Sequence, residues 1–425
     1  MKLDSYWLDT TPAFGGGAQG DVSGRADVVV IGGGFTGLSA ALALGRRKAS
    51  VVVLEAGRVL GEASGRNGGQ CNNGLAHDYA GLVRSMGAEQ ARALYLAFNA
   101  AVGTVERLVQ EEQIACDFAR RGKLKLAVKP EHFASFAKAY ETLRVDVDPD
   151  VRLVPSDRLR TEIGSDIFHG GLVQPASAQL HPGKFGVGLA NAAARNGARI
   201  YESAAVTGLE RVSGSAYRVI SERGPIRADQ VLVATGCTRQ GPFGWFRRRI
   251  IPVGSFIVVT EPLTSSVLDR LLPTRRGCVT SANIGNYFRT TPDNRLLFGG
   301  RARFAMSNPR SDQKSGEILC AMLGRVFPEL RDVRIDYCWG GLVDITADRL
   351  PRAGEHEGMF YATGFSGHGV QMSAHMGQMM ADVMGGNRDA NPLRHLSWPS
   401  IFGYFGTPWF LPMVGAYYRL QDILH

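Results

Sequence analysis

The sequence contains no CxxC pair and no group of cysteine and histidine residues with the spacing of zinc ligands. Its six cysteines are scattered along the 425 residues, at Cys71, Cys116, Cys237, Cys278, Cys320 and Cys338. Structural zinc sites need paired ligands at short spacing, so we predict no metal site. Isolated cysteines of this kind are typical of free thiols in a reducing compartment, and we predict a cytoplasmic protein.

Long apolar runs are also missing. The N-terminus has no basic region followed by an apolar segment, so we expect no secretory signal. The longest apolar stretch, Val28 to Leu44, is interrupted by three consecutive glycines and is shorter than the roughly 20 residues that cross a bilayer. We therefore expect no transmembrane segment. The hydrophobic content of 44% is nevertheless enough for sizeable globular cores.

The basic charge is not concentrated at one place. A total of 48 lysines and arginines against 39 acidic residues gives a net charge of +9, yet the densest basic run is only Arg247 to Arg249. No basic segment carries the interleaved aromatic residues that stack on bases. We expect a diffusely basic, solvated surface and no nucleic-acid partner.

Aromatic residues gather in the final segment, from Trp398 to His425. Two interpretations stay open for this segment: an arm packed on the body of the protein, or a surface that makes peripheral contact with a membrane or a partner. The sequence leaves the oligomeric state unknown.

A strand, a glycine turn, a helix and a second strand are predicted within "ADVVVIGGGFTGLSAALALGRRKASVVVLEAG". Val28 to Ile31 and Val51 to Leu54 are apolar runs typical of strands buried on both faces. Between them, small and apolar residues repeat at helical spacing from Phe35 to Gly45. Together they form one βαβ unit.

The same type of pattern returns much later in the chain. Residues 86 to 144 look helical apart from a turn of strand around "GKLKLAV", and residues 250 to 340 alternate like an antiparallel sheet with a "PDN" turn between two strands. The segment "GMFYATGFSGHGVQMSAHMGQMMADVM" then repeats the order of strand, glycine turn and helix. We expect one domain to be assembled from separated pieces of chain.

The glycine turn of the βαβ unit carries a dinucleotide-binding pattern. Gly32, Gly34 and Gly37 form GxGxxG between the strand and the helix, and Glu55 closes the second strand. Glycine allows the tight turn and the close approach of a pyrophosphate to the helix N-terminus, while the carboxylate accepts hydrogen bonds from a ribose. In this complete βαβ context the pattern predicts dinucleotide binding.

A polar loop, "EASGRNGGQCNNGL" at residues 62 to 75, follows Glu55 closely, and we expect neither helix nor strand in it. An NAD domain would normally continue to another βαβ unit, so this loop favours FAD. Ser64, Arg66 and Asn67 are expected to bond phosphate and ribitol oxygens, and Gly68 with Gly69 to let the backbone lie against a flat ring. The alternative is a polar surface turn.

Four segments carry a family resemblance: "VVVIGGGFTGLSAALALG", "LEAGRVLGEASGRNGGQ", "VLVATG" and "GLVDITADRLPRAGEHEGMFYATGFSGHGVQMSAHMG". In them the chain resembles the D-amino acid oxidase (DAO) superfamily of FAD oxidoreductases. "SGRNGGQ" and the ending "PWFLPMVGAYYRLQD" look most like the gamma-glutamylputrescine oxidoreductase branch. The resemblance covers nearly the whole chain.

The resemblance implies an α/β fold of the α+β two-domain kind, glutathione-reductase-like. A Rossmann-like FAD-binding domain would comprise the discontinuous segments 1–82, 150–245 and 336–390. A substrate domain with an antiparallel sheet and helices, residues 83–149 and 246–335, would cover the flavin, and residues 391–425 would form a C-terminal arm.

The resemblance also implies cofactor contacts by position. Val206 would meet the adenine, Thr235 and Gly236 would close over the cofactor, and the helix beginning after Gly367 would point its N-terminus at the flavin, where reduction places negative charge. The full set of expected FAD contacts is Gly32, Gly34, Phe35, Thr36, Gly37, Glu55, Ala56, Ser64, Arg66, Asn67, Gly68, Gly69, Gln70, Val206, Thr235, Gly236, Gly341, Gly367, His368, Gly369, Val370 and Gln371.

The chain departs from relatives that oxidise free amino acids. The position of the glycine-oxidase-type arginine holds Val343, and that of the sarcosine-oxidase-type lysine holds Gln371. Without a cation for the α-carboxylate, a free amino acid in the usual pose is disfavoured. Asp344 stands next to the first position and would attract a substrate ammonium group, or it caps a turn before Thr346.

Tyr287 and Arg289 share one face of a predicted strand. They would hold a distal carboxylate or amide of the substrate, or they are ordinary surface residues. Relatives with covalent flavin use a histidine in the loop at 62–70 or a cysteine near Gly341, and this chain has neither. We predict noncovalent FAD. The lysine that promotes reaction with oxygen is matched by Leu297, so oxygen and another electron acceptor both stay open.

The predicted reaction is oxidation of an amine C–N bond, with a polyamine or gamma-glutamylated amine as substrate. Hydride would pass to flavin N5, giving an imine and then an aldehyde. His368 is the nearest candidate base, or a hydrogen-bonding group at the flavin edge. One alternative is a secondary or D-amino acid of sarcosine or opine type, held by Arg289 or Arg66. Another is a catalytically silent flavoprotein.

Overall fold

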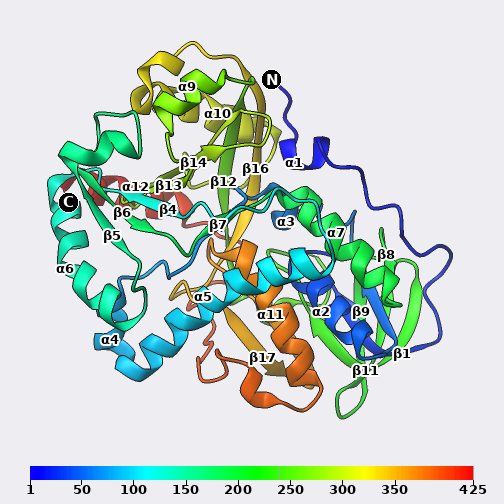
Figure 1. Cartoon of the computed structure of the whole chain (residues 1–425). Helices are drawn as coiled ribbons and strands as arrows, with labels where there is room; N and C mark the ends of the chain where they lie inside the picture. Colours follow the sequence, from blue (N-terminus) through cyan, green and yellow to red (C-terminus); the bar gives the residue numbers. More distant parts are fainter. Residues whose placement is uncertain (239, 425) are drawn as a thin grey trace.

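The computed structural model describes residues 1–238 and 240–424, and within them the strands form two eight-stranded sheets and one two-stranded sheet (Figure 1). Residue 239, within the segment 150–245, and residue 425, within the C-terminal arm, lie outside the described residues. The predicted fold class is confirmed: parallel strands with helices form one part, and a largely antiparallel sheet forms the other.

The first sheet is built from segments far apart in the sequence. Its strand order is β17-β18-β11-β1-β2-β8, and β10 and β9 continue from β11 as an antiparallel ribbon. The strands are β1 (Arg25–Ile31), β2 (Val51–Leu54), β8 (Arg199–Tyr201), β9 (Val206–Ser213), β10 (Ala216–Ser221), β11 (Gly224–Val233), β17 (Arg352–His356) and β18 (Met359–Thr363). The pairs β1 with β2 and β1 with β11 are parallel, as their continuous apolar runs predict.

Four helices share the largest hydrophobic core with β1 and β2. They are α2 (Phe35–Arg46), α5 (Ala88–Glu111), α7 (Pro182–Arg195) and α11 (Gly369–Met384). In Figure 1, α5 runs across the middle of the view, and α11 and α2 lie side by side below its right-hand end. The close packing of α2 on α11 needs a glycine, because a Cβ at Gly377 would lie 2.4 Å from the Thr36 carbonyl oxygen.

The second sheet has the order β16-β12-β15-β14-β13-β4-β6-β5. Its strands are β4 (Lys123–Leu126), β5 (Arg152–Pro155), β6 (Gly170–Gln174), β12 (Ile251–Thr260), β13 (Gly277–Thr280), β14 (Asn286–Thr290), β15 (Leu296–Gly300) and β16 (Ile335–Ile345). The predicted "PDN" turn joins β14 and β15, which pair antiparallel. Side chains of α10 (Pro309–Val326) pack on one face of this sheet in a second core.

Three strands of the second sheet fall in segments that the sequence assigned to the FAD-binding domain. These are β5 and β6, from the segment 150–245, and β16, from the segment 336–390. Local sequence patterns indicate a strand but not its partner. The pairings of β16 with β12 and of β6 with β4 depend on contacts between distant residues. The division into domains stays a prediction.

The polar loop at residues 62 to 75 is more regular than its sequence predicts. It contains one helical turn, α3 (Ala63–Arg66), and a short strand, β3 (Gln70–Cys71). The expectation of neither helix nor strand was wrong because β7 (Ala178–Gln179), about a hundred residues away in the chain, supplies the backbone partner of β3. A local pattern cannot reveal such a partner.

Other helices lie around these layers. They are α1 (Tyr6–Asp9), α4 (Tyr79–Met86), α6 (Pro130–Asp146), α8 (Gly244–Arg247), α9 (Ser265–Leu271) and α12 (Leu411–Leu424). Residues 86 to 144 thus contain two long helices and β4, as predicted. Among residues 1–238 and 240–424, no helix is both long and apolar enough to cross a membrane.

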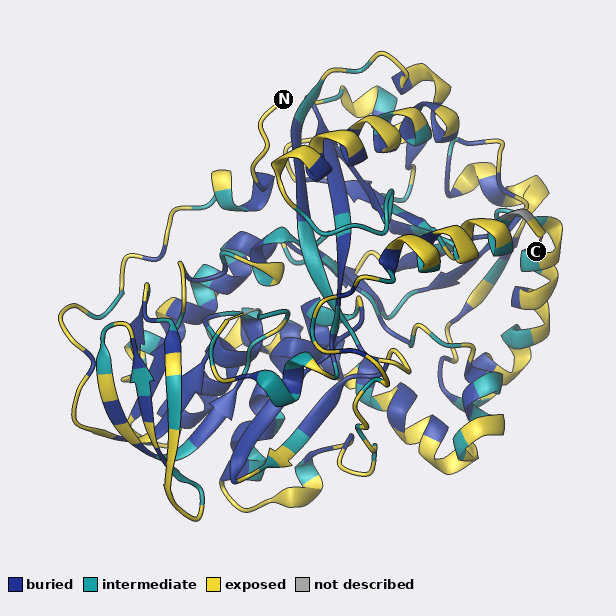
Figure 2. Cartoon of the chain, turned by 180° about the vertical axis from the view of Figure 1, so that it is seen from behind, coloured by how far each residue is buried: buried dark blue, intermediate teal, exposed yellow. Residues whose placement is uncertain are grey.

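The C-terminal arm is partly packed and partly exposed. Tyr404 is buried and donates to the Ile250 carbonyl oxygen at 2.9 Å, and the Asp422 carboxylate accepts from the Ile284 N–H at 2.9 Å. The outward side of α12, near the C mark in Figure 2, is exposed. Its exposed apolar side chains and those just before it are Phe402, Phe405, Trp409, Met413, Tyr417, Leu420 and Leu424.

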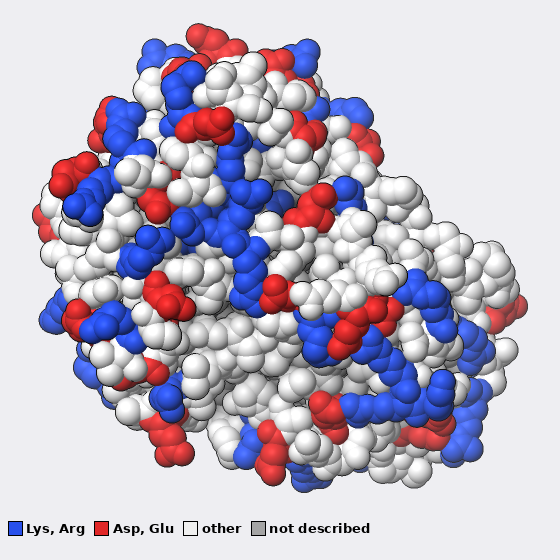
Figure 3. All heavy atoms as spheres, viewed as in Figure 1, with Lys and Arg blue, Asp and Glu red and all other residues white. Residues whose placement is uncertain are grey.

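Charges of both signs are mixed on the surface. Basic side chains form a band near the middle of the face in Figure 3 and a second group at its lower right, and acidic side chains lie beside both. Many are paired; Arg46, for example, contacts Glu111 and Glu112 at 2.8 and 2.6 Å. In the described part of the chain all six cysteines are free, and no group of three or more His, Cys, Asp or Glu side chains has metal-binding geometry.

Candidate active site

The GxGxxG turn links β1 to α2 with glycine at the positions that need it. Gly32 has φ +115°, and a Cβ there would lie 2.8 Å from the Ala234 carbonyl oxygen. At Gly37 a Cβ would lie 1.9 Å from the Gly32 carbonyl oxygen. Phe35 and Thr36 begin α2 directly after the turn, so the turn presents a helix N-terminus to a bound group.

Glu55 ends the strand side of this site. Its carboxylate accepts hydrogen bonds from the Gly33 N–H at 2.7 Å and the Gly57 N–H at 2.8 Å. Ala56, which follows Glu55 in the chain, is exposed. Burial raises the pKa of Glu55, while the two backbone N–H groups oppose that rise. The carboxylate thus lies directly beside the glycine turn, as the dinucleotide pattern requires.

The polar side chains of the loop contact the protein backbone. Ser64 Oγ accepts from the Phe35 N–H at 3.0 Å, and Arg66 donates to the carbonyl oxygens of Gly61 and Gly340 at 2.9 and 3.1 Å. Asn67 donates to the Ser64 carbonyl oxygen at 2.8 Å and accepts from the Gly69 N–H at 2.9 Å.

These three side chains were assigned to phosphate and ribitol oxygens from the sequence. In this structure they shape the loop, since side chains that follow a tight turn readily bond its backbone, and their contacts to FAD stay a prediction. Backbone groups and glycine positions are therefore the main surface that the loop offers to a cofactor.

The loop lies against one face of the second sheet. A Cβ at Gly68 would lie 2.7 Å from the Tyr287 ring, and one at Gly69, where φ is +66°, would lie 2.8 Å from Arg289 Nη2. Gln70 Nε2 donates to the carbonyl oxygens of Cys278 and Phe288, both at 3.3 Å. Glycine at 68 and 69 is required by this sheet face, whatever binds on the other side of the loop.

Arg289 is fully buried and bonded to the loop. Its guanidinium donates to the Gly69 carbonyl oxygen at 3.1 Å and the Leu180 carbonyl oxygen at 2.7 Å, and it lies 5.1 Å from the Trp7 ring centroid. Burial lowers the pKa of Arg289 to about 9. The alternative of a surface residue is wrong. Its hydrogen bonds go to the loop backbone, so Arg289 positions the loop.

Tyr287 lies on the same face and has a different environment. Its hydroxyl is 3.1 Å from Ser255 Oγ, and burial raises its pKa to about 12. Gly341 is opposite Ser255 in the pairing of β12 with β16. A Cβ added at Gly341 would lie 3.1 Å from the Arg66 Cβ, so glycine leaves room for the Arg66 side chain. Tyr287 is a neutral hydrogen-bonding group at physiological pH.

Open space for a cofactor lies along three glycines that the sequence singled out. Added Cβ atoms at Gly236 and Gly367 would have no heavy atom within 4 Å, and one at Gly369 would have only the Phe365 Cβ, at 3.8 Å. Thr235 beside Gly236 is tied to the far strand because its carbonyl oxygen accepts from Thr363 Oγ1 at 2.9 Å. Val206 begins β9 and is buried.

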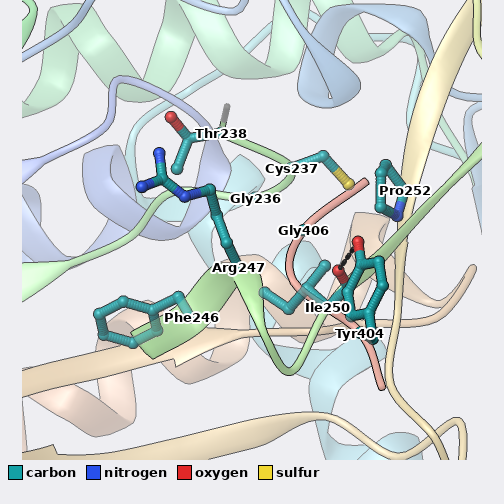
Figure 4. Close-up of a pocket in the computed structure, with 9 residues that line it drawn as sticks. All are labelled: Gly236, Cys237, Thr238, Phe246, Arg247, Ile250, Pro252, Tyr404 and Gly406. Carbon is teal, nitrogen blue, oxygen red and sulfur yellow. Dashed lines mark hydrogen bonds between the residues drawn. The ribbon is translucent and has the colours of Figure 1, made fainter. Parts of the chain in front are cut away.

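A small cavity of about 20 Å³ adjoins Gly236 (Figure 4). Pro252 and Tyr404 line its other side, and the Tyr404 hydroxyl points to Ile250. The remaining lining residues are Cys237, Thr238, Phe246, Arg247, Ile250 and Gly406. The cavity therefore brings together the loop after β11, the start of β12 and the C-terminal arm.

Helix α11 begins beside this space. Gly369, Val370 and Gln371 form its first turn, whose N–H groups have no partners within the helix. Gln371 is buried and donates to the Asn72 carbonyl oxygen at 2.5 Å, but among the described residues its Oε1 has no hydrogen-bond partner. A buried acceptor without a partner is costly, so it suits a ligand that brings an N–H or O–H group.

His368 immediately precedes α11. Its ring packs edge-on against Phe98 with 5.5 Å between ring centroids. Burial lowers the pKa of His368 to about 3, and the charges of Lys123, His77 and Arg301 lower it further. The imidazole is therefore neutral at physiological pH and is a weak base.

Asp344 caps the turn that leads into α11. Its carboxylate accepts from the Gly364 N–H at 2.7 Å, and its backbone carbonyl oxygen accepts from the Ser366 N–H at 3.2 Å. The turn that follows Thr346 is bonded by Asp348, whose carboxylate accepts from Thr346 Oγ1 at 3.3 Å. Burial raises the pKa of Asp344 to about 6, against the opposing effect of the backbone N–H groups.

Four candidate side chains lie deep in the protein without being fully buried. Burial is the largest cause of the pKa shifts of Tyr287, Asp344, His368 and Arg301. Each of these residues nevertheless keeps part of its surface accessible to solvent. A groove of about 510 Å³ has His77, Asp78 and Asp348 among its lining residues.

The sequence analysis missed Arg301. No motif marks it, because it follows a strand that pairs like any other in the sheet. Its place is visible only from the register: it continues the face of β15 that carries Gly299, which is opposite Tyr287.

The glycine turn, the buried carboxylate, the open glycines and the unpartnered acceptor of Gln371 fit an extended dinucleotide with a flat ring. They define the chain as a two-domain, dinucleotide-binding flavoprotein. Residues 27–383 match the family model DAO, described as FAD dependent oxidoreductase. The chain belongs to this family, and its cofactor is FAD, held noncovalently. Cys338, the cysteine nearest to Gly341 in sequence, is buried and bonded to the Asp312 carbonyl oxygen.

Known relatives agree with this assignment. The chain is 32% identical to gamma-glutamylputrescine oxidoreductase of Escherichia coli strain K12 over 408 residues, covering 94% of this chain and 93% of the relative. Among solved structures, glycine oxidase from Geobacillus kaustophilus aligns with a TM-score of 0.69 and 23% identity, over 88% of this chain and 96% of that one. L-proline dehydrogenase from P. horikoshii aligns with a TM-score of 0.70 and 19% identity, over 86% and 94%. The protein is an FAD-dependent oxidoreductase.

Proposed function

We propose that this oxidoreductase oxidises the C–N bond of an amine from the polyamine or gamma-glutamylated amine class. The observation that carries the proposal is the absence of a cation at two described positions beside the flavin site. Val343 and Gln371 stand where an α-carboxylate anchor is expected, and the Gln371 amide nitrogen is already bonded to Asn72. The similarity to a gamma-glutamylputrescine oxidoreductase supports the same substrate class.

Bound FAD supplies the hydride acceptor for this reaction, and the protein supplies position and desolvation. The substrate amine must bind as the free base, since a protonated nitrogen has no lone pair to assist loss of hydride. The neutral His368 suits that requirement, because it accepts or donates a hydrogen bond without adding charge. The resulting imine is hydrolysed by water to an aldehyde and an amine.

Two side chains have positioning roles in this proposal. Asp344 holds the turn from Gly364 to Ser366, which aims the first turn of α11 at the flavin edge. Tyr287 presents a neutral ring and hydroxyl to the cavity. Neither group has to transfer a proton. The electron acceptor is oxygen or another compound, and the six free cysteines suit a reducing cytoplasm.

The alternative substrate, a secondary or D-amino acid, has less support. Its carboxylate was assigned to Arg289 or Arg66, and both guanidinium groups are bonded to backbone carbonyl oxygens. A catalytically silent flavoprotein is the other alternative. It predicts a flavin that no amine reduces.

A panel of substrates with an artificial electron acceptor tests the proposal, whichever acceptor the protein uses in the cell. We expect turnover and aldehyde formation with gamma-glutamylated diamines or free polyamines, and little turnover with sarcosine or D-alanine. Preferential turnover of sarcosine or D-alanine would contradict the proposal, and reduction by none of these compounds would favour the silent flavoprotein.

A further inference from the structure

Arg301 lies on the face of the second sheet that covers the FAD site. Along β15, Leu296 and Phe298 point into the core under α10, whereas Leu297 packs in the cluster on the opposite face. Side chains alternate along a strand, so Gly299 and Arg301 continue the face of Leu297. Tyr287, paired with Gly299, lies on this face too.

The strand register places Arg301 on the same face of the sheet as Tyr287, with which it interacts electrostatically. In the pairing of β12 with β15, Phe256 is opposite Gly300, so one further step puts Arg301 opposite Ser255. Ser255 in turn is paired with Gly341 and bonds the Tyr287 hydroxyl. Arg301 therefore shares the Tyr287 side of the sheet with Gly341.

The surroundings of Arg301 contain no compensating negative charge. Its nearest charged and titratable neighbours are Arg349, Tyr418 and Tyr287. Over residues 1–238 and 240–424, its half-buried side chain forms neither an ion pair nor a hydrogen bond. A guanidinium removed from water without a partner is costly. Burial, followed by the charge of Arg349, accordingly lowers its pKa.

The other two candidate arginines show the contrast. Arg66 and Arg289 are also removed from solvent in part or completely, and both satisfy their donors with backbone carbonyl oxygens. Arg301 alone of the three has its donors available. A planar group with several N–H donors is well suited to bind a carboxylate through two parallel hydrogen bonds.

We propose that Arg301 is the carboxylate-binding residue of the substrate cavity and holds the carboxylate at the non-reacting end of a glutamylated amine. This inference rests on the proposed amine oxidation and adds its specificity. The carboxylate of the glutamyl group completes an ion pair that the protein leaves open. An amine without a carboxylate leaves it unpaired and binds more weakly.

The C-terminal arm forms one wall of this carboxylate site. Phe304, three residues after Arg301, stacks on Tyr418 of α12 with 5.7 Å between ring centroids and 19° between ring planes. The Ala305 carbonyl oxygen accepts from the Gly254 N–H at 3.0 Å and fastens the same segment to β12. These contacts hold the segment that follows Arg301 against the sheet. In this proposal the C-terminal arm therefore lies next to the bound substrate.

The decisive test uses two substrates that differ only by the carboxylate. A gamma-glutamyl diamine is compared with the gamma-aminobutyryl amide of the same diamine, in which hydrogen replaces that carboxylate. For Arg301→Gln we expect the KM of the glutamyl substrate to rise about a hundredfold, with kcat and the constants of the analogue within twofold of wild type. Arg301→Lys should recover part of the loss, because it restores the charge without the planar fork.

Arg310→Gln is the matched control, since Arg310 is an exposed arginine on the first turn of α10. It should change neither substrate. Equal losses for both substrates in Arg301→Gln would overturn the proposal, as that result would mean a general structural role. Turnover of D-alanine or sarcosine that depends on Arg301 would also overturn it, by assigning the α-carboxylate of an amino acid to this residue.

A binding measurement separates this inference from the proposed reaction. N-acetylglutamate carries the carboxylate without an oxidisable amine, and its binding to the oxidised holoenzyme is followed by the shift of the visible flavin spectrum. We expect saturable binding to wild type and Arg310→Gln, and at least tenfold weaker binding to Arg301→Gln. Equal binding to all three would refute the carboxylate site, even if amines are oxidised. Selective loss without amine turnover would refute only the proposed reaction.

Discussion

Single glycines next to the second sheet decide whether the FAD loop can keep its path. Gly69 has φ +66°, and its missing Cβ leaves the space occupied by the Leu180 carbonyl oxygen, 2.5 Å from where that Cβ would lie. We expect Gly69→Ala to weaken FAD binding at least tenfold, because the loop must shift away from both Leu180 and Arg289. Titration of the apoprotein with FAD measures this effect.

Gly87→Ala provides the control for that substitution. Gly87 also has a positive φ, +87°, but an added Cβ would have no heavy atom within 4 Å. It should lower the thermal unfolding temperature slightly and leave FAD affinity unchanged. If the two variants bind FAD equally well, contact with the loop is not what requires glycine at position 69.

The shifted pKa of the Asp344 carboxyl group should make the free energy of unfolding depend on pH. Its pKa is raised to about 6 in the folded protein, from an ordinary value of 3.8. Between these values the folded state binds more protons than the unfolded state, so this contribution to stability falls as pH rises through that window, by about 3 kcal/mol. Above pH 6 the full penalty of the buried charge remains.

Denaturant unfolding of wild type and Asp344→Asn from pH 4 to 7 measures this contribution. The asparagine cannot ionise, and its side-chain oxygen can still accept from the Gly364 N–H. We expect the difference in unfolding free energy, variant minus wild type, to increase as the pH rises. A difference that does not change with pH would show that Asp344 titrates at its ordinary value.

At the scale of elements, β14 and the loop at residues 62 to 75 depend on one another through Arg289. Its hydrogen bonds to Gly69 and Leu180 connect the strand to the loop and to the segment before α7. Arg289→Met keeps much of the buried volume but removes both donors. We expect a fall in thermal unfolding temperature of several degrees and weaker FAD binding. The buried Leu180 carbonyl oxygen loses the Arg289 donor, and the Gly69 carbonyl oxygen keeps only the Leu180 N–H, at 3.0 Å.

Arg218→Met is a suitable comparison, because Arg218 forms an exposed ion pair with Glu210 at 3.0 Å in the β9–β10 ribbon. Exposed pairs contribute little to stability, so this variant should behave like wild type. Unchanged FAD affinity in Arg289→Met would mean that the guanidinium does not position the loop.

Elements differ in how far the sequence alone predicts them. The strands β1 and β2 and the helix α2 were predictable because apolar periodicity, a glycine turn and a terminal carboxylate agree with one another. The short strand β3 was missed because its partner β7 is distant in the chain. Arg301 was missed for a related reason: its place on the Tyr287 side of the sheet follows from the register of β12, β14 and β15, which no single strand reveals.

In the whole molecule, a nucleotide-binding sheet made from distant segments meets a second sheet. The loop at residues 62 to 75 packs directly on the second sheet at Tyr287 and Arg289, and α11 begins after β18 of the first sheet. The sequence predicted the nucleotide side well because its turns need particular residues. Prediction of the opposite side requires the register of eight strands.

In the proposed reaction an amine, and not a free α-amino acid, reduces the flavin of this protein. Anaerobic mixing of the oxidised holoenzyme with a gamma-glutamyl diamine tests it most directly, by following the long-wavelength absorbance of the flavin. The account predicts rapid bleaching with this compound and little with sarcosine or D-alanine at the same concentration. Rapid bleaching by sarcosine or D-alanine, with none by the glutamylated amine, would contradict it.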